Sequence, residues 1–92
     1  MRRKVYVVCG STGEYSDRAE WLVAAHTKEK DAQRHVLLAA READRIKEER
    51  GNRYTSPREG SNRFDANMRM DYTGTSYYYD TTELHEKFIE EV

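Results

Sequence analysis

The side chains of this sequence that could perform chemistry are one cysteine, three histidines and a set of scattered carboxylates. Cys9 ends the apolar run that starts at Val5, so we expect it to be a small buried side chain rather than a nucleophile. His26 could approach Cys9 across a hairpin. A nucleophilic pair also needs a third group to orient it, and none stands at a recognisable position.

Neither the histidines nor the glycines follow the spacing of a known metal or phosphate site. His26, His35 and His85 are scattered, and no HExxH or CxxC motif accompanies them, so we predict no metal site. The segment Gly10–Gly13 follows an apolar run, as phosphate-binding loops do. It lacks the GxxxxGK(S/T) spacing, and no helix follows it directly. We interpret it as a hairpin loop and predict no cofactor.

The carboxylates that could gather near this loop are Glu14, Asp17, Glu20 and Asp71. A carboxylate pair performs acid–base chemistry only when its surroundings separate the two pKa values, and nothing in the sequence indicates such burial. We therefore expect exposed acids, no catalytic residue and a protein that is not an enzyme.

The composition indicates one small domain without the charge surplus of a polyanion binder. The 92 residues carry 16 basic and 17 acidic side chains and a formal net charge of −1, whereas nucleic-acid-binding domains usually carry a strong basic excess. This length predicts a single domain over residues 1–92. No apolar stretch approaches the length of a membrane span, and a single cysteine fits a reducing compartment, so we expect a cytoplasmic protein.

Three segments predict the first elements that position these side chains. Lys4–Cys9 and Glu20–Ala25 are rich in β-branched or other apolar residues and predict two strands joined by a long hairpin loop. From about residue 28 to residue 50, apolar residues recur at spacings of four and three, which predicts one buried face of a long helix. The residues of this stripe are Ala32, Val36, Ala39, Ala43 and Ile46.

The remainder of the chain predicts shorter elements. Residues 51–64 contain two glycines, two asparagines and the only proline, which predicts a flexible loop. Met68, Met70 and Tyr72 alternate as in a short, half-buried strand, and Thr75–Thr82 predicts a further strand.

Together these elements predict an α+β fold with the order β-β-α-β. A three- to four-stranded antiparallel sheet should pack on the one long helix, because the stripe of that helix is the only large apolar surface that can cover the sheet. In the last strand, Tyr77 and Tyr79 should face one side of the sheet and Tyr78 the other. Apolar residues four apart in the acidic tail allow a short C-terminal helix over Glu83–Val92.

A local excess of arginine provides an alternative function. Five arginines and only two acids lie between Arg50 and Arg69 inclusive, and arginine pairs well with phosphate. A nucleic-acid-binding accessory protein would use these contacts: Arg53, Arg58, Arg63 and Arg69. A solvated loop explains the same residues, and we prefer that interpretation.

Two blocks of the sequence resemble a group of small accessory proteins of bacteriophages. The blocks are VYVVCGSTGEYSDRAEWLVAA at residues 5–25 and FDANMRMDYTGTSYYY at residues 64–79, and they cover somewhat under half of the chain. The resemblance implies a hairpin, a helix and a closing strand, and it carries no activity, cofactor or catalytic residue. Small phage accessory proteins are often binders of host or defence proteins, and anti-CRISPR proteins share this size, lack of motifs and charged surface.

We therefore predict a non-enzymatic protein of the host-cell cytoplasm, a monomer or small homo-oligomer, that binds and inhibits a host or antiviral-defence protein. Its expected contacts lie in predicted loops or on exposed faces: Tyr15, Asp17, Asp71, Glu86 and Glu90. Nucleic acid is the less favoured partner. A third hypothesis is a binder of a small ligand such as a nucleotide, which would use residues 10–18 and the tyrosines.

Overall fold

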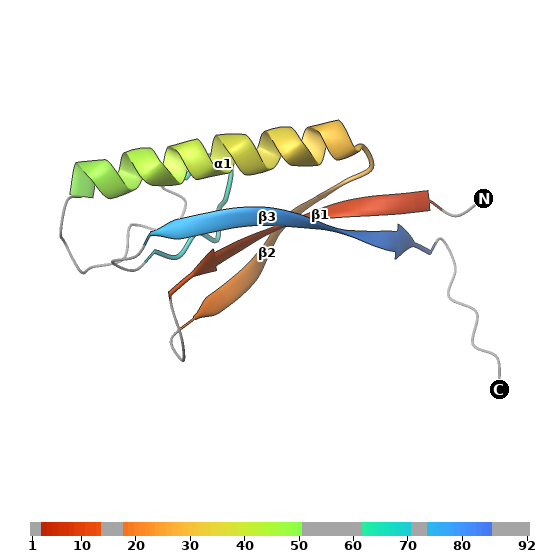
Figure 1. Cartoon of the computed structure of the whole chain (residues 1–92), viewed down its shortest axis with the longest axis horizontal. Coiled ribbons are helices and arrows are strands. Elements are labelled where there is room, and N and C mark those ends of the chain that lie inside the picture. The colour runs from red at the N-terminus through yellow and green to blue at the C-terminus, as the bar shows by residue number, and fades with distance from the viewer. Residues whose placement is uncertain (1–2, 14–17, 51–61, 71–73, 86–92) are drawn as a thin grey trace.

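The chain forms a three-stranded antiparallel sheet with one long helix on one face (Figure 1). The computed structural model describes residues 3–13, 18–50, 62–70 and 74–85. The elements follow in the order β1 (Arg3–Thr12), β2 (Ala19–His26), α1 (Glu29–Arg50) and β3 (Thr75–Leu84). In the sheet β1 lies in the middle, between β2 and β3. The predicted α+β fold and its β-β-α-β order are confirmed, with three strands.

Strand β1 is longer than predicted, because Gly10–Thr12 belong to the strand and not to a loop. The reason is the close approach of Trp21, which lies opposite Gly10 on β2. A Cβ atom at Gly10 would lie 2.5 Å from Cε2 of the Trp21 ring. Gly10 is therefore a position where the Trp21 indole passes close to the backbone of β1. The polar residues Ser11 and Thr12 after it wrongly indicated a loop.

Strand β2 confirms the second predicted strand and adds a β-bulge. Its register with β1 shifts between Val8 and Cys9, which pair with Ala24 and Leu22, so Val23 is the extra residue on β2. A bulge of this kind bends a strand and increases its local twist. It leaves Trp21 on the same face of the sheet as the helix.

Helix α1 lies across the sheet with the predicted stripe facing inward. Ala32, Ala39, Ala43 and Ile46 are buried and Val36 is half-buried. Three of the four buried side chains are alanines, so the helix backbone can approach the strands closely. Ala43 and Ile46 form the centre of the core with Met68 and Met70. No helix in the described ranges is long and apolar enough to span a membrane.

The segment 62–70 differs from both predictions that were made for it. Met68 and Met70 are buried as expected, but residues 68–70 form no strand and instead follow turns over residues 63–67. Asn62 is buried and contacts α1, so it is not part of an open loop. Residues 51–61 and 71–73 lie outside the described residues.

Strand β3 extends past its predicted end. Glu83 and Leu84 belong to the strand and pair with Lys4 and Arg3 of β1, so the helix predicted from Glu83 does not begin there. The ten-residue β1–β3 ladder continues the strand beyond the tyrosine run. The rest of the predicted helix, residues 86–92, lies outside the described residues.

Candidate functional site

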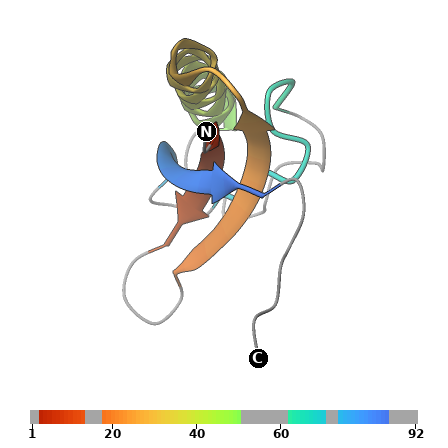
Figure 2. The same cartoon turned by 90° about the vertical axis from the view of Figure 1, so that its right-hand side faces the viewer.

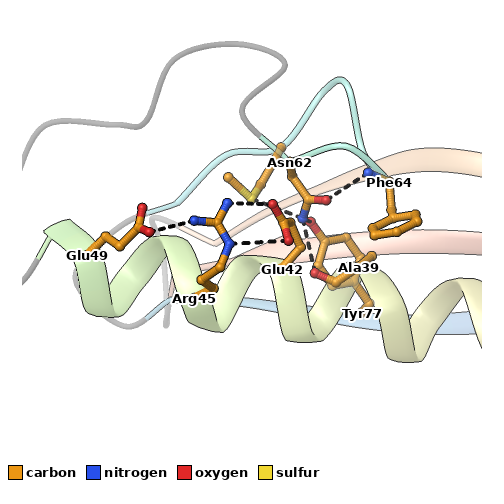
Figure 3. A network of polar contacts seen from close by, with 8 residues as sticks. Ala39, Glu42, Arg45, Glu49, Asn62, Phe64 and Tyr77 are labelled. Atoms are coloured by element: carbon orange, nitrogen blue, oxygen red, sulfur yellow. Dashed lines mark hydrogen bonds and ion pairs between the residues drawn. The ribbon is translucent and has the colours of Figure 1, made fainter.

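A chain of buried polar contacts joins four parts of the molecule. The side-chain amide of Asn62 donates to the carbonyl oxygen of Ala39 on α1 at 3.0 Å and to the hydroxyl of Tyr77 on β3 at 3.2 Å. The Tyr77 hydroxyl then donates to Asp65 at 2.8 Å. The indole N–H of Trp21 on β2 donates to the same Asp65 oxygen, also at 2.8 Å. Figure 3 shows the first part of this network beside α1.

Asp65 is the centre of this network and is only 2% exposed. Its second oxygen accepts the backbone N–H of Asn67 at 3.0 Å, so both oxygens have donors. Burial, followed by the contact with the Asp65 carboxylate, raises the pKa of the Tyr77 hydroxyl well above its ordinary value. Tyr77 therefore stays protonated and donates. This arrangement holds the segment 62–70 in place, and both oxygens of Asp65 accept hydrogen bonds from the protein itself.

Two histidines form a second polar contact between β2 and α1. Nε2 of His35 lies 2.6 Å from the carbonyl oxygen of Phe64, which can only accept, so Nε2 carries a proton. Nδ1 of His35 lies 2.8 Å from Nε2 of His26. In the neutral pair Nδ1 accepts from His26. The described residues contain no group of three or more His, Cys, Asp or Glu side chains that could hold a metal ion.

Cys9 and His26 lie on opposite faces of the sheet. His26 pairs with Tyr6 of β1 and contacts α1 through His35, whereas Cys9 is an odd number of residues from Tyr6 and faces away from α1. Burial raises the pKa of the Cys9 thiol, which lowers the fraction of reactive thiolate. The two side chains therefore do not form a nucleophilic pair.

The face of the sheet opposite α1 carries a group of apolar side chains, which we call the open face. The register with β1 defines this face, because Cys9 pairs with Leu22 on β2 and with Tyr78 on β3. The residues just before these two, Trp21 and Tyr77, both pair with Gly10 and lie on the helix side of the sheet. The apolar residues of the open face are Val5, Val7, Cys9, Leu22, Ala25, Tyr78 and Leu84.

Leu22 is 70% exposed, the highest value among the large apolar side chains of the described residues. Cys9 beside it is buried. Partial burial raises the pKa of the Tyr78 hydroxyl, with further contributions from Cys9 and Glu20. Figure 2 shows α1 on one side of the sheet only, with the segment 62–70 beside it near β2. No described element covers the open face.

Acidic side chains flank the open face on two strands. Glu20 on β2 is paired at 2.8 Å with Arg18, and Asp80 on β3 is exposed opposite Val7 of β1. Both carboxylates act on the Cys9 thiol electrostatically, which places them on the same face. The open face is therefore an apolar patch with acid at two of its margins.

The structure describes only some of the residues that were predicted to contact a protein or nucleic-acid partner. The five partner-binding residues, Tyr15, Asp17, Asp71, Glu86 and Glu90, lie outside the described residues, as do Arg53 and Arg58. Arg63 is exposed, stacks over Phe64 at 5.3 Å from the ring centroid and lowers the pKa of nearby Glu42, after the larger effect of Arg45. Arg69 is exposed elsewhere on the segment.

The open face was missed at the sequence level, although one signal was available. In β1 both alternating sets are largely apolar: Val5, Val7 and Cys9 on one face, Tyr6 and Val8 on the other. A strand that is apolar on both faces needs two covering layers, and this sequence contains one long apolar helix. The second set of apolar side chains on β1, which the helix cannot reach, therefore indicated that one face of the sheet is left uncovered.

Compared with protein-family models, with curated proteins and with solved structures, the chain matches none. Its function must therefore be argued from its own geometry.

Proposed function

We propose that this chain is a non-enzymatic binding protein that attaches to another protein through its open face. The observation that carries the proposal is Leu22, which is 70% exposed in a patch with Val5, Val7 and Tyr78. Contiguous apolar patches of this kind on small proteins commonly mark interaction sites. A protein of the infected host cell, or of its antiviral defence, is the partner expected from the phage resemblance, and occlusion of its surface is the expected mode of inhibition.

The margins of the open face specify the chemistry of that partner. Asp80 and Glu20 place carboxylates on β3 and β2 next to the apolar residues. A complementary surface offers an apolar patch bordered by Lys or Arg. Charges of this kind at the rim mainly increase the association rate and the specificity, while the apolar centre supplies the affinity.

The alternative functions have less support from the described residues. Arg63 lies near Glu42, an acid that offsets part of its positive charge, which weakens the case for a phosphate contact at Arg63. The small-ligand hypothesis relied on a loop from Gly10, but Gly10–Thr12 are part of β1 and Trp21 fills the space at Gly10.

The experiment compares capture of host proteins by the wild type, by Leu22→Glu and by Leu37→Glu. Leu37 is 49% exposed on α1, away from the open face, so it is a matched control. We expect a protein that is retained by wild type and Leu37→Glu but lost with Leu22→Glu. With the purified partner, Leu22→Glu should weaken binding at least about tenfold.

Two results would contradict the proposal. One is a partner whose affinity is unchanged by Leu22→Glu. The other is an affinity for DNA or RNA that falls steeply with salt and decreases on Arg63→Ala or Arg69→Ala, which would support the nucleic-acid-binding alternative.

A further inference from the structure

The two edges of the sheet differ in how they are protected. The edge strand β2 is interrupted by the bulge at Val23, and Trp21 and His26 bond to the segment 62–70 and to α1. The edge strand β3 pairs with β1 in an unbroken register over ten residues. It contains no proline, glycine, lysine or arginine, and its two charged residues, Asp80 and Glu83, both lie in its second half. Natural sheets usually interrupt or charge an edge of this length, because its free backbone groups can pair with another strand.

The first seven residues of β3, Thr75–Thr81, are nearly symmetric about Tyr78. If two copies of β3 pair antiparallel around a twofold axis at Tyr78, like or compatible residues meet across the axis. Tyr77 of one copy faces Tyr79 of the other, Thr75 faces Thr81, Ser76 faces Asp80, and Tyr78 faces itself. Aromatic pairs and Thr–Thr pairs stabilise antiparallel strands, and no like charges lie opposite each other.

Helix α1 carries opposite charges at its two ends. Glu29 contacts Tyr79, the residue after Tyr78, and the Lys47 side chain lies against Gly74, just before β3 begins, so both residues lie on the β3 side of α1. A twofold axis at Tyr78 makes the two helices antiparallel, so the end of α1 that carries Glu29 in one copy lies on the same side as the end that carries Lys47 in the other.

The spacing of the layers also permits this arrangement. α1 contacts β3 and β1 more than β2, and Figure 2 shows it above that part of the sheet. A helix centred between β1 and β3 would lie roughly two strand spacings, about 10 Å, from its copy across a β3–β3 pair. Packed helices are about 8–10 Å apart, so the sheet can continue without a clash between the two helices.

We propose that a second copy of this chain pairs with the outer edge of β3 around a twofold axis at Tyr78, which joins two three-stranded sheets into one. The two helices then lie side by side on one face, and the two open faces form one continuous surface on the other. This inference does not depend on the proposed function. Tyr78 belongs to both surfaces, but Leu22 lies on β2, at the opposite edge of the sheet from the outer edge of β3, so Leu22→Glu and Ser76→Asp distinguish the two contacts.

The test uses charges that meet only across the axis. Ser76 and Asp80 are four residues apart on one strand, where they are too far apart to interact directly, and Ser76 is exposed. Sedimentation equilibrium should show a dimer of the wild type. Ser76→Asp places a carboxylate of each copy opposite Asp80 of the other, which creates two like-charge pairs across the axis. We expect the dissociation constant of the dimer to rise about tenfold. The double variant Ser76→Asp/Asp80→Lys should restore wild-type affinity, and Ser76→Lys should strengthen the dimer.

A cross-link provides a second measurement that does not rely on affinity. In a Cys9→Ala background, Tyr78→Cys places two thiols on the axis, where antiparallel Cα atoms lie about 4.5–5.5 Å apart and a disulfide can form. Mild oxidation should convert this variant to a covalent dimer much faster than Leu22→Cys in the same background. Cys9 must be removed because it pairs directly with Tyr78 within one chain.

Several outcomes would overturn the proposal. These are a wild type that stays monomeric at millimolar concentration, a dimer that Ser76→Asp and the double variant affect equally, and a dimer that is broken by Leu22→Glu but not by Ser76→Asp. The last result would show that the copies meet through the open face. Thermal melts of each variant show whether it is still folded, so that loss of the dimer can be assigned to the altered edge of β3 and not to unfolding.

Discussion

The helix-covered face of the sheet and the open face use neighbouring residues in opposite ways. Trp21 and Tyr77 on the covered face both bond to Asp65, whereas Leu22 and Tyr78, one position along each strand, lie on the open face with no described element above them. Asp65 is 2% exposed and Leu22 is 70% exposed. A shift of one residue thus separates side chains that stabilise the fold from side chains that remain available for binding.

The contacts that stabilise this small chain lie mainly on the covered face of the sheet. The described elements pack one face of the sheet, and the helix stripe that packs it is mostly alanine, which supplies little apolar area. The buried hydrogen bonds of segment 62–70 therefore hold together parts of the molecule that a larger apolar core would otherwise join. We expect substitutions on the covered face to change the free energy of unfolding and substitutions on the open face to change binding.

Among substitutions of polar residues, the largest effect is expected for Asp65→Ala. It leaves the indole N–H of Trp21 and the hydroxyl of Tyr77 without their acceptor in a buried site, which should cost about 3 kcal/mol of unfolding free energy. Urea denaturation followed by tryptophan fluorescence measures it. The matched control is Asp80→Ala, which removes an exposed acid from β3 and should change stability by less than about 0.5 kcal/mol. Equal effects for the two variants would show that the Asp65 network contributes no more than a surface charge.

A smaller effect is expected for Gly10→Ala. The new methyl group would lie where a Cβ atom meets the Trp21 ring at 2.5 Å, so strand and indole must separate, at a cost of about 1–3 kcal/mol. Ser11→Ala, at the next position of β1, should be nearly neutral. In a double-mutant cycle, Trp21→Ala should remove most of the penalty of Gly10→Ala, because the atoms that clash are then absent. Additive effects would contradict the contact.

The helix and the strands could be predicted because their signals are local. The spacing of Ala32, Val36, Ala39, Ala43 and Ile46 repeats with the period of a helix, and the stripe is buried as predicted. The alternation of Tyr77, Tyr78 and Tyr79 was also predicted correctly: Tyr77 and Tyr79 contact the helix side, and Tyr78 lies on the open face. Patterns within one element require no knowledge of what the element packs against.

The segment 62–70 and the end of β1 could not be predicted in this way, because distant contacts determine them. Asn62 and Asp65 are typical loop residues by type, and their burial depends on Tyr77 and Trp21, which are distant in sequence. Gly10 is a strong turn signal on its own, and its place in a strand depends on Trp21. The possible contribution of the five predicted contact residues, from Tyr15 to Glu90, stays a prediction.

The smallest effect is expected for Leu22→Ser on the open face. Since Leu22 is already 70% exposed, shortening it removes little packing, and the free energy of unfolding should change by less than about 0.5 kcal/mol. Ile46→Ala, on the covered face, should instead cost about 2–4 kcal/mol through the loss of a buried side chain. Urea melts of the two variants under one set of conditions give the comparison. If Leu22→Ser cost as much as Ile46→Ala, the open face would have to be covered within the molecule itself, and its availability for a partner would have to be abandoned.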